Sequence, residues 1–363
     1  DRRGMLLAIE EFNAQGGVLG RPIQWIHYDT ETNPATGTRI AERLITQDGA
    51  DFLIGAVHSG VANAISQVAQ KHGVIYFNTN SSSPTESGKD CHRTKFVWDG
   101  HGGNFSRATA QAAIDAYGPN WVLLTNDYVW GHETSAATRA LAEASGAAIV
   151  DELLVPQNTR DFSSYLLTLQ QLAPDVVAAA VGGDDLKALR IQVVESGLDQ
   201  NIGWINNQQD WPDVYGVPPF GTFGTTWYYD LDLPGVKEFV AKYQETYPDT
   251  SLKVPGNVYY NGYMATKTLL QAIESAGTTN NHEIIKALEG WKWTAEERMQ
   301  EHSAWIDPDT HQVQQTIYLA TGKAPESEYD IYEILLAVSP EDVMAKSADC
   351  QLESFEDTPV FEP

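Results

Sequence analysis

Cysteine is scarce in this sequence, and neither copy stands where a metal ligand would be expected. The 363 residues include only two cysteines, Cys91 and Cys350. They lack CxxC spacing and belong to no His–Cys cluster with ligand spacing, so we expect no zinc and no other metal site. A disulfide formed in an oxidising compartment and a pair of free thiols both agree with this count. The cysteines alone do not decide between them.

Basic residues and long apolar runs are also few. The chain has 23 Lys and Arg against 49 Asp and Glu, a formal net charge of −26. Nucleic-acid and anionic membrane surfaces attract basic proteins, so we expect neither partner. No apolar run is long enough for a membrane-spanning helix, which excludes insertion in a membrane. The sequence opens on DRRGMLLAIEEFN without a signal peptide, so an exported protein would have this sequence only after processing.

Motifs of catalysis and of cofactor binding are absent as well. The sequence has no GxGxxG after a strand, no GxxxxGK[ST] and no GxSxG. His132 and Glu133 lack the second histidine of the HExxH zinc motif, and the nine histidines are scattered. We therefore expect neither an enzyme nor a cofactor.

What the sequence does have is a regular alternation of strand-like and helical segments. The first helical segment, DRRGMLLAIEEFNAQGG, places Met5, Leu6, Ile9 and Phe12 on one face. Alternation of this kind predicts βαβ units and parallel sheets. The segments that we expect as strands are RPIQWIHYD, ADFLIGAV, VIYFNT, NWVLLTND, AAIVDELLVP, DVVAAAVGG, NIGWINN, GTTWYYDL, QTIYLATG and YDIYEILLAV.

The alternation forms two series that meet near residue 102, in DGHGGNFS. We therefore predict an α/β fold of two doubly wound parallel-sheet lobes, with several chain crossings that act as a hinge. Residues 1–102 and about 232–300 would form the first lobe, and residues 103–231 and about 301–340 the second. Residues 341–363 would be a tail that returns to the first lobe.

Polar and aromatic residues gather where the predicted strands end. In open parallel sheets, ligands bind outside the carboxyl ends of the strands. His58 and Ser59 follow one strand, and Asn80, Ser81 and Ser82 follow the next. Similar runs supply the remaining candidates, which are Tyr128, Trp130, Asp184, Gln209, Asp210 and Tyr229. Each could be an ordinary turn, cap or core-edge residue, and it is their joint pattern that favours a binding site.

These residue types suit a small polar ligand with an apolar body. Hydroxyls and backbone N–H groups can receive a carboxylate, and an aspartate can pair with an amine. Tyrosine and tryptophan can enclose a ring or an alkyl group, and an aromatic box can also hold a quaternary ammonium.

Four segments carry a resemblance to a known family. LLAIEEFNAQGGVLGRPI, IGAVHSGVANAISQVAQKHGVIYFNT, NDYVWGH and PDVVAAAVGGDDLKALR resemble the type I periplasmic binding proteins of branched-chain (hydrophobic) amino-acid ABC transporters. Relatives that bind amino acids, aromatic acids or amides look nearest. The resemblance implies two lobes joined by three crossover segments, with the ligand trapped between them by hinge closure.

The resemblance also implies roles for single residues. Ser59, Asn80 and Ser82, with Ser81 beside them, would hold the carboxylate of the ligand. Trp130 would supply the aromatic contact, and Asp184, Gln209 and Asp210 fall near the contacts of the second lobe. A Cys91–Cys350 disulfide is implied too, and with it an oxidising periplasm. One departure is that the family begins with a strand and a Gly/Ser loop, whereas this sequence begins at the first helix.

We therefore predict the periplasmic substrate-binding component of an ABC importer, a monomer that captures a small organic carboxylate and delivers it to a membrane permease. Alternative ligands are amides, urea and quaternary ammonium compounds. An alternative role is a ligand-sensing domain of a receptor or regulator, which would need a DNA-binding or transmembrane segment elsewhere. An enzyme on the same scaffold would need a nucleophile–base pair, and the sequence offers none.

Overall fold

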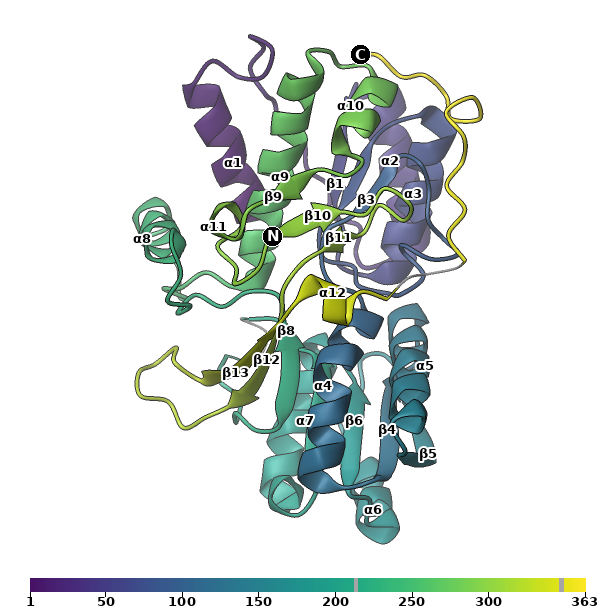
Figure 1. The fold of residues 1–363 in the computed structure, drawn as a ribbon, viewed down its shortest axis with the longest axis vertical. Helices are drawn as coiled ribbons and strands as arrows, with labels where there is room; N and C mark the ends of the chain where they lie inside the picture. Colours follow the sequence, from purple (N-terminus) through teal and green to yellow (C-terminus); the bar gives the residue numbers. More distant parts are fainter. Residues whose placement is uncertain (212–214, 346–348) are drawn as a thin grey trace.

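In the computed structural model the chain forms two lobes, one above the other in Figure 1. The structure describes residues 1–211, 215–345 and 349–363. Each lobe is built around its own sheet. Three segments before β12 (Ile317–Gly322) pass between the lobes, and the tail that follows α12 (Pro340–Val343) returns to the first lobe. This is the α/β architecture that the alternation predicts, and the predicted fold class is confirmed.

The first lobe contains a three-stranded parallel sheet of β1 (Leu53–Gly55), β2 (Tyr76–Asn78) and β3 (Lys95–Val97). Its helices are α1 (Arg2–Ala14), α2 (Pro34–Thr46), α3 (Ser59–His72), α8 (Val236–Thr246), α9 (Asn257–Ala276) and α10 (Asn281–Leu288). Helix α9 is buried along most of its length because α1 packs on it. An alanine in place of Gly4 would put its Cβ 2.0 Å from the carbonyl oxygen of Tyr259, so this helix pair needs glycine at its closest approach.

The second lobe is built on a seven-stranded sheet with the order β13-β12-β8-β7-β6-β4-β5. Its strands are β4 (Asn120–Asn126), β5 (Ala148–Val155), β6 (Val176–Ala180), β7 (Gly203–Gln208), β8 (Thr222–Thr225), β12 (Ile317–Gly322) and β13 (Tyr332–Val338). Its helices are α4 (Gly102–Tyr117), α5 (Val129–Ala144), α6 (Ser163–Leu172), α7 (Gly183–Ser196), the 3₁₀ helix η1 (Leu198–Gln200) and α12 (Pro340–Val343). Side chains on successive residues of β4 enter different cores. Trp121 and Leu123 pack with Ala110 and Ala142 of α4 and α5, whereas Val122 and Leu124 belong to the main cluster.

Some segments differ from the sequence-based expectation. The strand predicted for RPIQWIHYD does not form, because β1 is an edge strand and no described strand pairs with residues 22–29. A small antiparallel sheet that the sequence did not predict lies beside the first lobe. It consists of β9 (Lys292–Trp293), β10 (Ala304–Ile306) and β11 (Val313–Gln314), with the short helix α11 (Ala295–Arg298) between β9 and β10. Strand β8 ends at Thr225, so Trp227–Tyr229 lie beyond the sheet.

The last crossing from the first lobe to the second, expected near residue 301, therefore lies later in the chain. Strand β10 pairs with β9, β11 pairs with β10, and Gln312 bridges to Val97 of β3, whereas the sequence placed residues from about 301 in the second lobe. The division into lobes remains a proposal, in which we move this crossing to residues 315–316.

The C-terminal tail runs back along the first lobe (Figure 1). The backbone N–H of Asn281 donates to the carbonyl oxygen of Phe361, and that of Arg93 donates to Glu353 Oε2. The disulfide between Cys91 and Cys350, as the resemblance implies, ties the start of this tail to the loop before β3.

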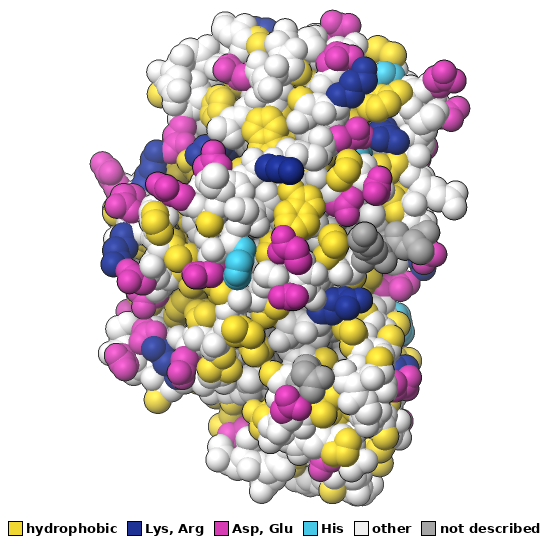
Figure 2. Space-filling model, viewed as in Figure 1, with side chains coloured by type: hydrophobic (Ala, Val, Ile, Leu, Met, Phe, Trp, Pro, Cys, Tyr) yellow, Lys and Arg dark blue, Asp and Glu magenta, His cyan; other side chains and the backbone are white. Residues whose placement is uncertain are grey.

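The surface in Figure 2 carries Asp and Glu side chains over both lobes, with fewer Lys and Arg among them. This distribution agrees with the net charge of −26. Among the described residues, no helix combines the length and the apolar character needed to cross a bilayer.

Candidate functional site

A cavity of about 1400 Å³ lies between the two lobes and continues into the first. Seven of the predicted site residues line it: His58, Asn80, Ser82, Tyr128, Trp130, Asp184 and Asp210. They come from both lobes and from several different strand ends. The arrangement agrees with the rule that ligands of parallel sheets bind beyond the carboxyl ends of the strands.

Asn80 and Ser82 face the cavity from the loop after β2, and both bond to residues that follow or end β7. Asn80 Nδ2 donates to Asp210 Oδ2 over 3.3 Å, and Ser82 Oγ donates to Gln208 Oε1 over 2.5 Å. The loop itself is held by Asn78, whose side chain accepts from the N–H of Ser81 and donates to its carbonyl oxygen. The polar block after β2 is therefore an ordered turn whose exposed groups already meet the opposite wall.

Tyr128 and Trp130 form the aromatic wall on the second lobe, with ring centroids 5.9 Å apart. They stand at the start of α5, where the helix approaches the end of β4 closely. A Cβ on Gly131 would come within 2.0 Å of the carbonyl oxygen of Asn126, so only glycine permits this approach. The Tyr-Val-Trp-Gly sequence thus sets the position of both rings.

His58 reaches across from the first lobe to this aromatic wall. Its ring stacks on Tyr128, with centroids 4.9 Å apart and planes 16° apart. The amide Nε2 of Gln157 donates to His58 Nε2 over 3.1 Å, which requires that nitrogen to be unprotonated. Burial accordingly lowers the pKa of His58.

Three helices begin at the cavity wall. His58, Tyr128 and Gly182 are the N-cap residues of α3, α5 and α7, and all three line the cavity. None of the three helices receives a hydrogen bond from the side chain of its N-cap residue. Free N–H groups and the positive end of the helix dipole make such termini suited to a carboxylate.

Asp185 lies just inside α7 and is fixed by its neighbours, whereas Asp184 is at the rim. Asn126 Nδ2 and the backbone N–H of Asn158 both donate to Asp185 Oδ2, over 3.2 and 3.1 Å. Burial raises the pKa of Asp185. Asp184 is exposed and pairs with Arg160 and Lys187, so its charge is balanced by partners in solvent.

Asp210 forms the floor of the cavity and is partly exposed to it. Besides Asn80, it accepts hydrogen bonds from Asn257 Nδ2 over 2.5 Å and from Gln208 Nε2 over 3.2 Å. Burial raises the pKa of Asp210, and these amide donors oppose the increase.

Ser59 and Ser81 do not line the cavity, although the sequence pointed to both. Both are buried, and Ser81 Oγ lies 3.0 Å from Ser59 Oγ and 2.8 Å from Glu86 Oε1. Glu86 in turn accepts from the fully buried Lys95 Nζ over 2.9 Å. These hydroxyls complete the hydrogen bonding of a buried ion pair inside the first lobe.

Gln209 and Tyr229 also lie outside the cavity wall. Gln209 is buried in the second lobe, where its Oε1 accepts from Arg190 Nη1 and its Nε2 donates to Tyr332. Tyr229 packs beside Trp211 and Tyr228 in the segment after β8. A shift in the β7–β8 register between Asn206 and Gln208 breaks the alternation, so Gln208 rather than Gln209 faces the cavity.

Several cavity residues were not chosen from the sequence. They are Asn126, Gln157, Asn158, Arg160, Asp185 and Gln208. All of them end or closely follow strands, or begin the helix after one. The rule that ligands bind beyond the carboxyl ends of parallel strands points to these segments. It does not say which side chains of a polar segment face the cavity.

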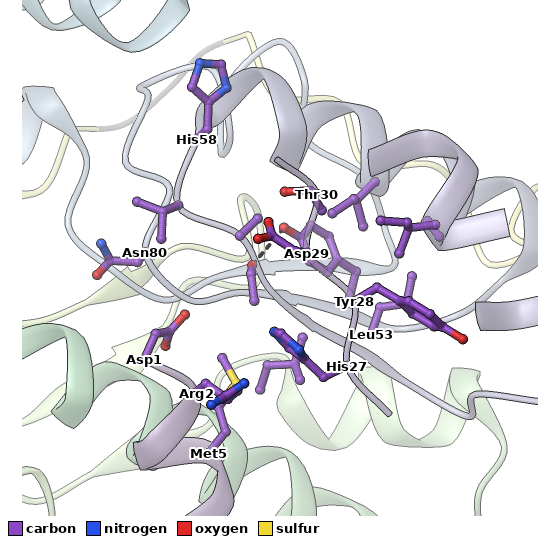
Figure 3. A pocket seen from close by; sticks show the side chains of 18 of the residues that line it. Asp1, Arg2, Met5, His27, Tyr28, Asp29, Thr30, Leu53, His58 and Asn80 are labelled. Atoms are coloured by element: carbon purple, nitrogen blue, oxygen red, sulfur yellow. Dashed lines mark hydrogen bonds between the residues drawn. The ribbon is translucent and has the colours of Figure 1, made fainter. Parts of the chain in front are cut away.

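The cavity extends beyond the cleft between the lobes. This part lies between α1, residues 21–32 and the free edge of β1, and Figure 3 shows Met5, His27, Tyr28 and Leu53 around it. Asp1 and Asn80 lie at the end nearer the cleft in that view.

The site has the features of a binding site. It offers hydroxyl, amide and carboxylate groups, an aromatic wall and uncapped helix termini. Within the described ranges, no three His, Cys, Asp or Glu side chains are grouped closely enough to hold a metal ion.

Comparison with known proteins supports the same conclusion. The chain is 25% identical over 296 residues to Leu/Ile/Val-binding protein homolog 7 of Brucella abortus (strain 2308), covering 75% of this chain and 71% of the relative. Its fold is similar to that of an amino acid ABC transporter substrate-binding protein from Pseudomonas fluorescens Pf-5, with a TM-score of 0.84, 23% identity, and 93% and 90% of the two chains covered.

A third similar protein is the solute-binding protein of an ABC transporter from Rhodopseudomonas palustris BisB5, solved in complex with 3,4-dihydroxybenzoic acid. The TM-score is 0.80, with 22% identity, and 93% and 91% of the two chains are covered. Over residues 1–327 the sequence matches a family of binding proteins, not of enzymes. The chain therefore belongs to the periplasmic binding protein family.

Proposed function

We propose that this protein is the substrate-binding component of an ABC importer in the periplasm. It captures a small organic carboxylate, an amino acid or an aromatic acid, between its lobes as the hinge closes. It then delivers the ligand to a membrane permease, acting as a monomer. Members of this family bind small ligands and work with such permeases.

One observation supports an organic carboxylate as the ligand. Three helix N-termini without a side-chain cap border the same cavity as the rings of Tyr128 and Trp130. The N–H groups at the starts of α3, α5 and α7 are suited to the carboxylate. Tyr128 and Trp130 are suited to the apolar or aromatic part of the ligand. A ligand between them would contact both lobes and favour the closed form.

The floor of the cavity supports an amino acid in particular. Asp210 presents a carboxylate where a ligand ammonium could sit, and Asn80 and Ser82 supply further polar contacts. The two solved relatives described above are named for an amino acid transporter and for a complex with an aromatic acid. Both chemistries therefore belong in the first experiment.

A thermal-shift screen over amino acids, aromatic acids, amides and betaines tests the proposal. A compound at about 100 times its dissociation constant should stabilise the protein by roughly 2.7 kcal/mol. A rise in melting temperature with at least one amino acid or aromatic acid is the expected result. If none of these acids shifts the melting temperature, the proposed ligand class is wrong.

A further inference from the structure

Two carboxylates share one amide group at the floor of the cleft. Gln208 Nε2 donates to Asp99 Oδ2 over 2.9 Å and to Asp210 Oδ1 over 3.2 Å. Asp210 is partly exposed to the cavity, whereas Asp99 is fully buried behind it. The two acids are therefore close neighbours, and only one of them can touch a ligand.

No Lys, Arg or His side chain of the described residues forms an ion pair with either carboxylate. The nearest charges act through space. The Arg298 guanidinium interacts with Asp99 in this way, and on the second-lobe side Tyr128 interacts with both Asp210 and Asp185. Burial raises the pKa of both acids, and repulsion by Asp210 raises that of Asp99 further.

An unpartnered polar atom belongs to a residue that lines the same cavity. Trp130 is buried in the cavity wall, and its indole Nε1 has no hydrogen-bond partner. Buried polar atoms normally have partners, so a ligand that supplies a hydrogen-bond acceptor would complete this part of the wall.

Asp99 also connects the segments that join the lobes. It lies in the first crossover, and its Oδ1 accepts from Thr226 Oγ1 of the second over 3.2 Å. Gln312 Nε2, just before the third crossover, donates to the carbonyl oxygen of Asp99 over 2.6 Å. Asp99 is therefore hydrogen-bonded to residues at the other two crossovers, through its carboxylate to Thr226 and through its backbone carbonyl to Gln312.

We propose that Asp99 and Asp210 share a proton when the cleft holds no ligand, and that a positively charged nitrogen of the ligand takes the place of this proton. This inference rests on the proposed binding function and narrows its ligand class to compounds that carry such a nitrogen. Asp210 contacts the nitrogen, and Asp99 is a positioning residue that acts through Gln208. The exchange is balanced, because one proton leaves to solvent for each cation bound.

The proposal predicts how affinity depends on pH. Below the pKa of the pair, the ligand must displace a proton and binds more weakly. As pH rises through that pKa the dissociation constant falls, by up to about tenfold per pH unit, and then becomes constant. A ligand without the nitrogen lacks this dependence.

Calorimetric titration with matched compounds tests this. L-Leucine and L-phenylalanine are compared with 4-methylpentanoate and 3-phenylpropanoate, which have the same carbon skeletons without the amine. The range is from about pH 6 to 8, where all four carboxyl groups are already ionised and release no proton of their own. Titration in two buffers of different ionisation enthalpy counts released protons. We expect up to about one more proton released per bound amino acid than per bound deaminated acid at low pH. His58 titrates in both series alike and cancels in this difference.

Asp99→Asn tests the role of the buried acid. The variant should still bind the amino acid, but the affinity should no longer follow pH as in the wild type. Asp232→Asn is the matched control, since the side chain of Asp232 is 94% exposed and pairs with Lys237 away from the cavity. This control should keep the full pH dependence. The comparison of proton release between amino acids and deaminated acids uses only the wild-type protein. It therefore tests the shared proton even if Asp99→Asn fails to fold.

The outcomes separate this proposal from the binding function. Equal proton release with amino acids and deaminated acids overturns the shared proton, as does a pH dependence that survives in Asp99→Asn. A preference of the protein for 4-methylpentanoate, 3-phenylpropanoate or another acid without a positive nitrogen overturns the narrowed ligand class while the binding function stands. If no acid of the wider screen binds, both fail.

Discussion

The ring of His58 in the first lobe stacks on the ring of Tyr128 in the second, with centroids 4.9 Å apart. This contact crosses the cleft at the candidate site. The Gln157 amide donates a hydrogen bond to Nε2 of the same imidazole. A contact of this kind exists only while the lobes are close. It therefore stabilises the closed form and should contribute to affinity in addition to the contact that Tyr128 makes with the ligand.

A double-mutant cycle measures this contribution. His58→Ala and Tyr128→Ala should each weaken binding of the compound with the largest thermal shift. Their effects should be coupled by about 0.5–1.5 kcal/mol, the usual extra value of an aromatic pair. Calorimetric titration of the four proteins gives the coupling. Additive effects would mean that the stack does not form in the bound state.

Trp130 should contribute more directly. Trp130→Ala removes a buried indole ring from the cavity wall and should weaken binding by about 1–3 kcal/mol. Trp130→Phe keeps an aromatic ring but loses the unpartnered N–H, so an intermediate loss is expected. Leu167→Ala, at an exposed position on α6, is the control that should bind as the wild type does. Unchanged affinity in Trp130→Ala would remove this residue from the site.

The Cys91–Cys350 disulfide should stabilise the folded chain. It closes a loop between residues 259 positions apart, which the chain-entropy model values at about 5 kcal/mol as an upper estimate. A variant with serine at both positions should unfold at lower denaturant concentration than the oxidised wild type, and reducing agent should affect only the wild type. Alkylation of the denatured, unreduced protein should label no cysteine. Two labelled cysteines would contradict the disulfide.

His101 gives a prediction for acid stability. Its Nδ1 accepts from the backbone N–H of Gly103 over 3.0 Å and caps α4, which requires that nitrogen to be unprotonated. Burial lowers the pKa of His101 to about 4, from an ordinary value of about 6.5. The stability linked to this group is thus fully present above about pH 6.5 and is lost as pH falls toward 4. The loss amounts to roughly 3 kcal/mol.

The comparison of His101→Asn with the wild type isolates this effect from other acidic groups. Asparagine can also accept at an N-cap but does not titrate. The difference in unfolding free energy between the two proteins should change in favour of the variant as pH falls from about 6.5 to 4. A difference that stays constant with pH would contradict the assignment.

Much of the fold could be predicted because its signals are local. Segments such as NWVLLTND and DVVAAAVGG carry enough apolar residues to be buried on both faces, and they form β4 and β6. The strand expected at residues 21–29 shows the limit. Its composition suits a strand, but a strand exists only when a neighbour pairs with its backbone, and β1 leaves that edge free.

The sequence predicts which segments form the site, because they follow the ends of strands. It does not predict which side chains of those segments face the cavity. Asn80, Ser82, Trp130 and Asp210 line the cavity, as expected for residues beyond parallel strands. Ser59 and Ser81 follow the same rule but turn inward to Glu86, a residue that lies close only in the folded lobe. Long-range partners of this kind leave no signal in the neighbouring sequence.

The structure of the protein with its ligand is the most direct test of the account. Crystals grown with the compound that gives the largest thermal shift should show it between Asn80 and Ser82 of the first lobe and Trp130 and Asp210 of the second. Its carboxylate should meet the helix N-termini, and a positive nitrogen should lie at Asp210. A compound bound elsewhere, for example only beside β1 in the first lobe, would contradict capture between the lobes.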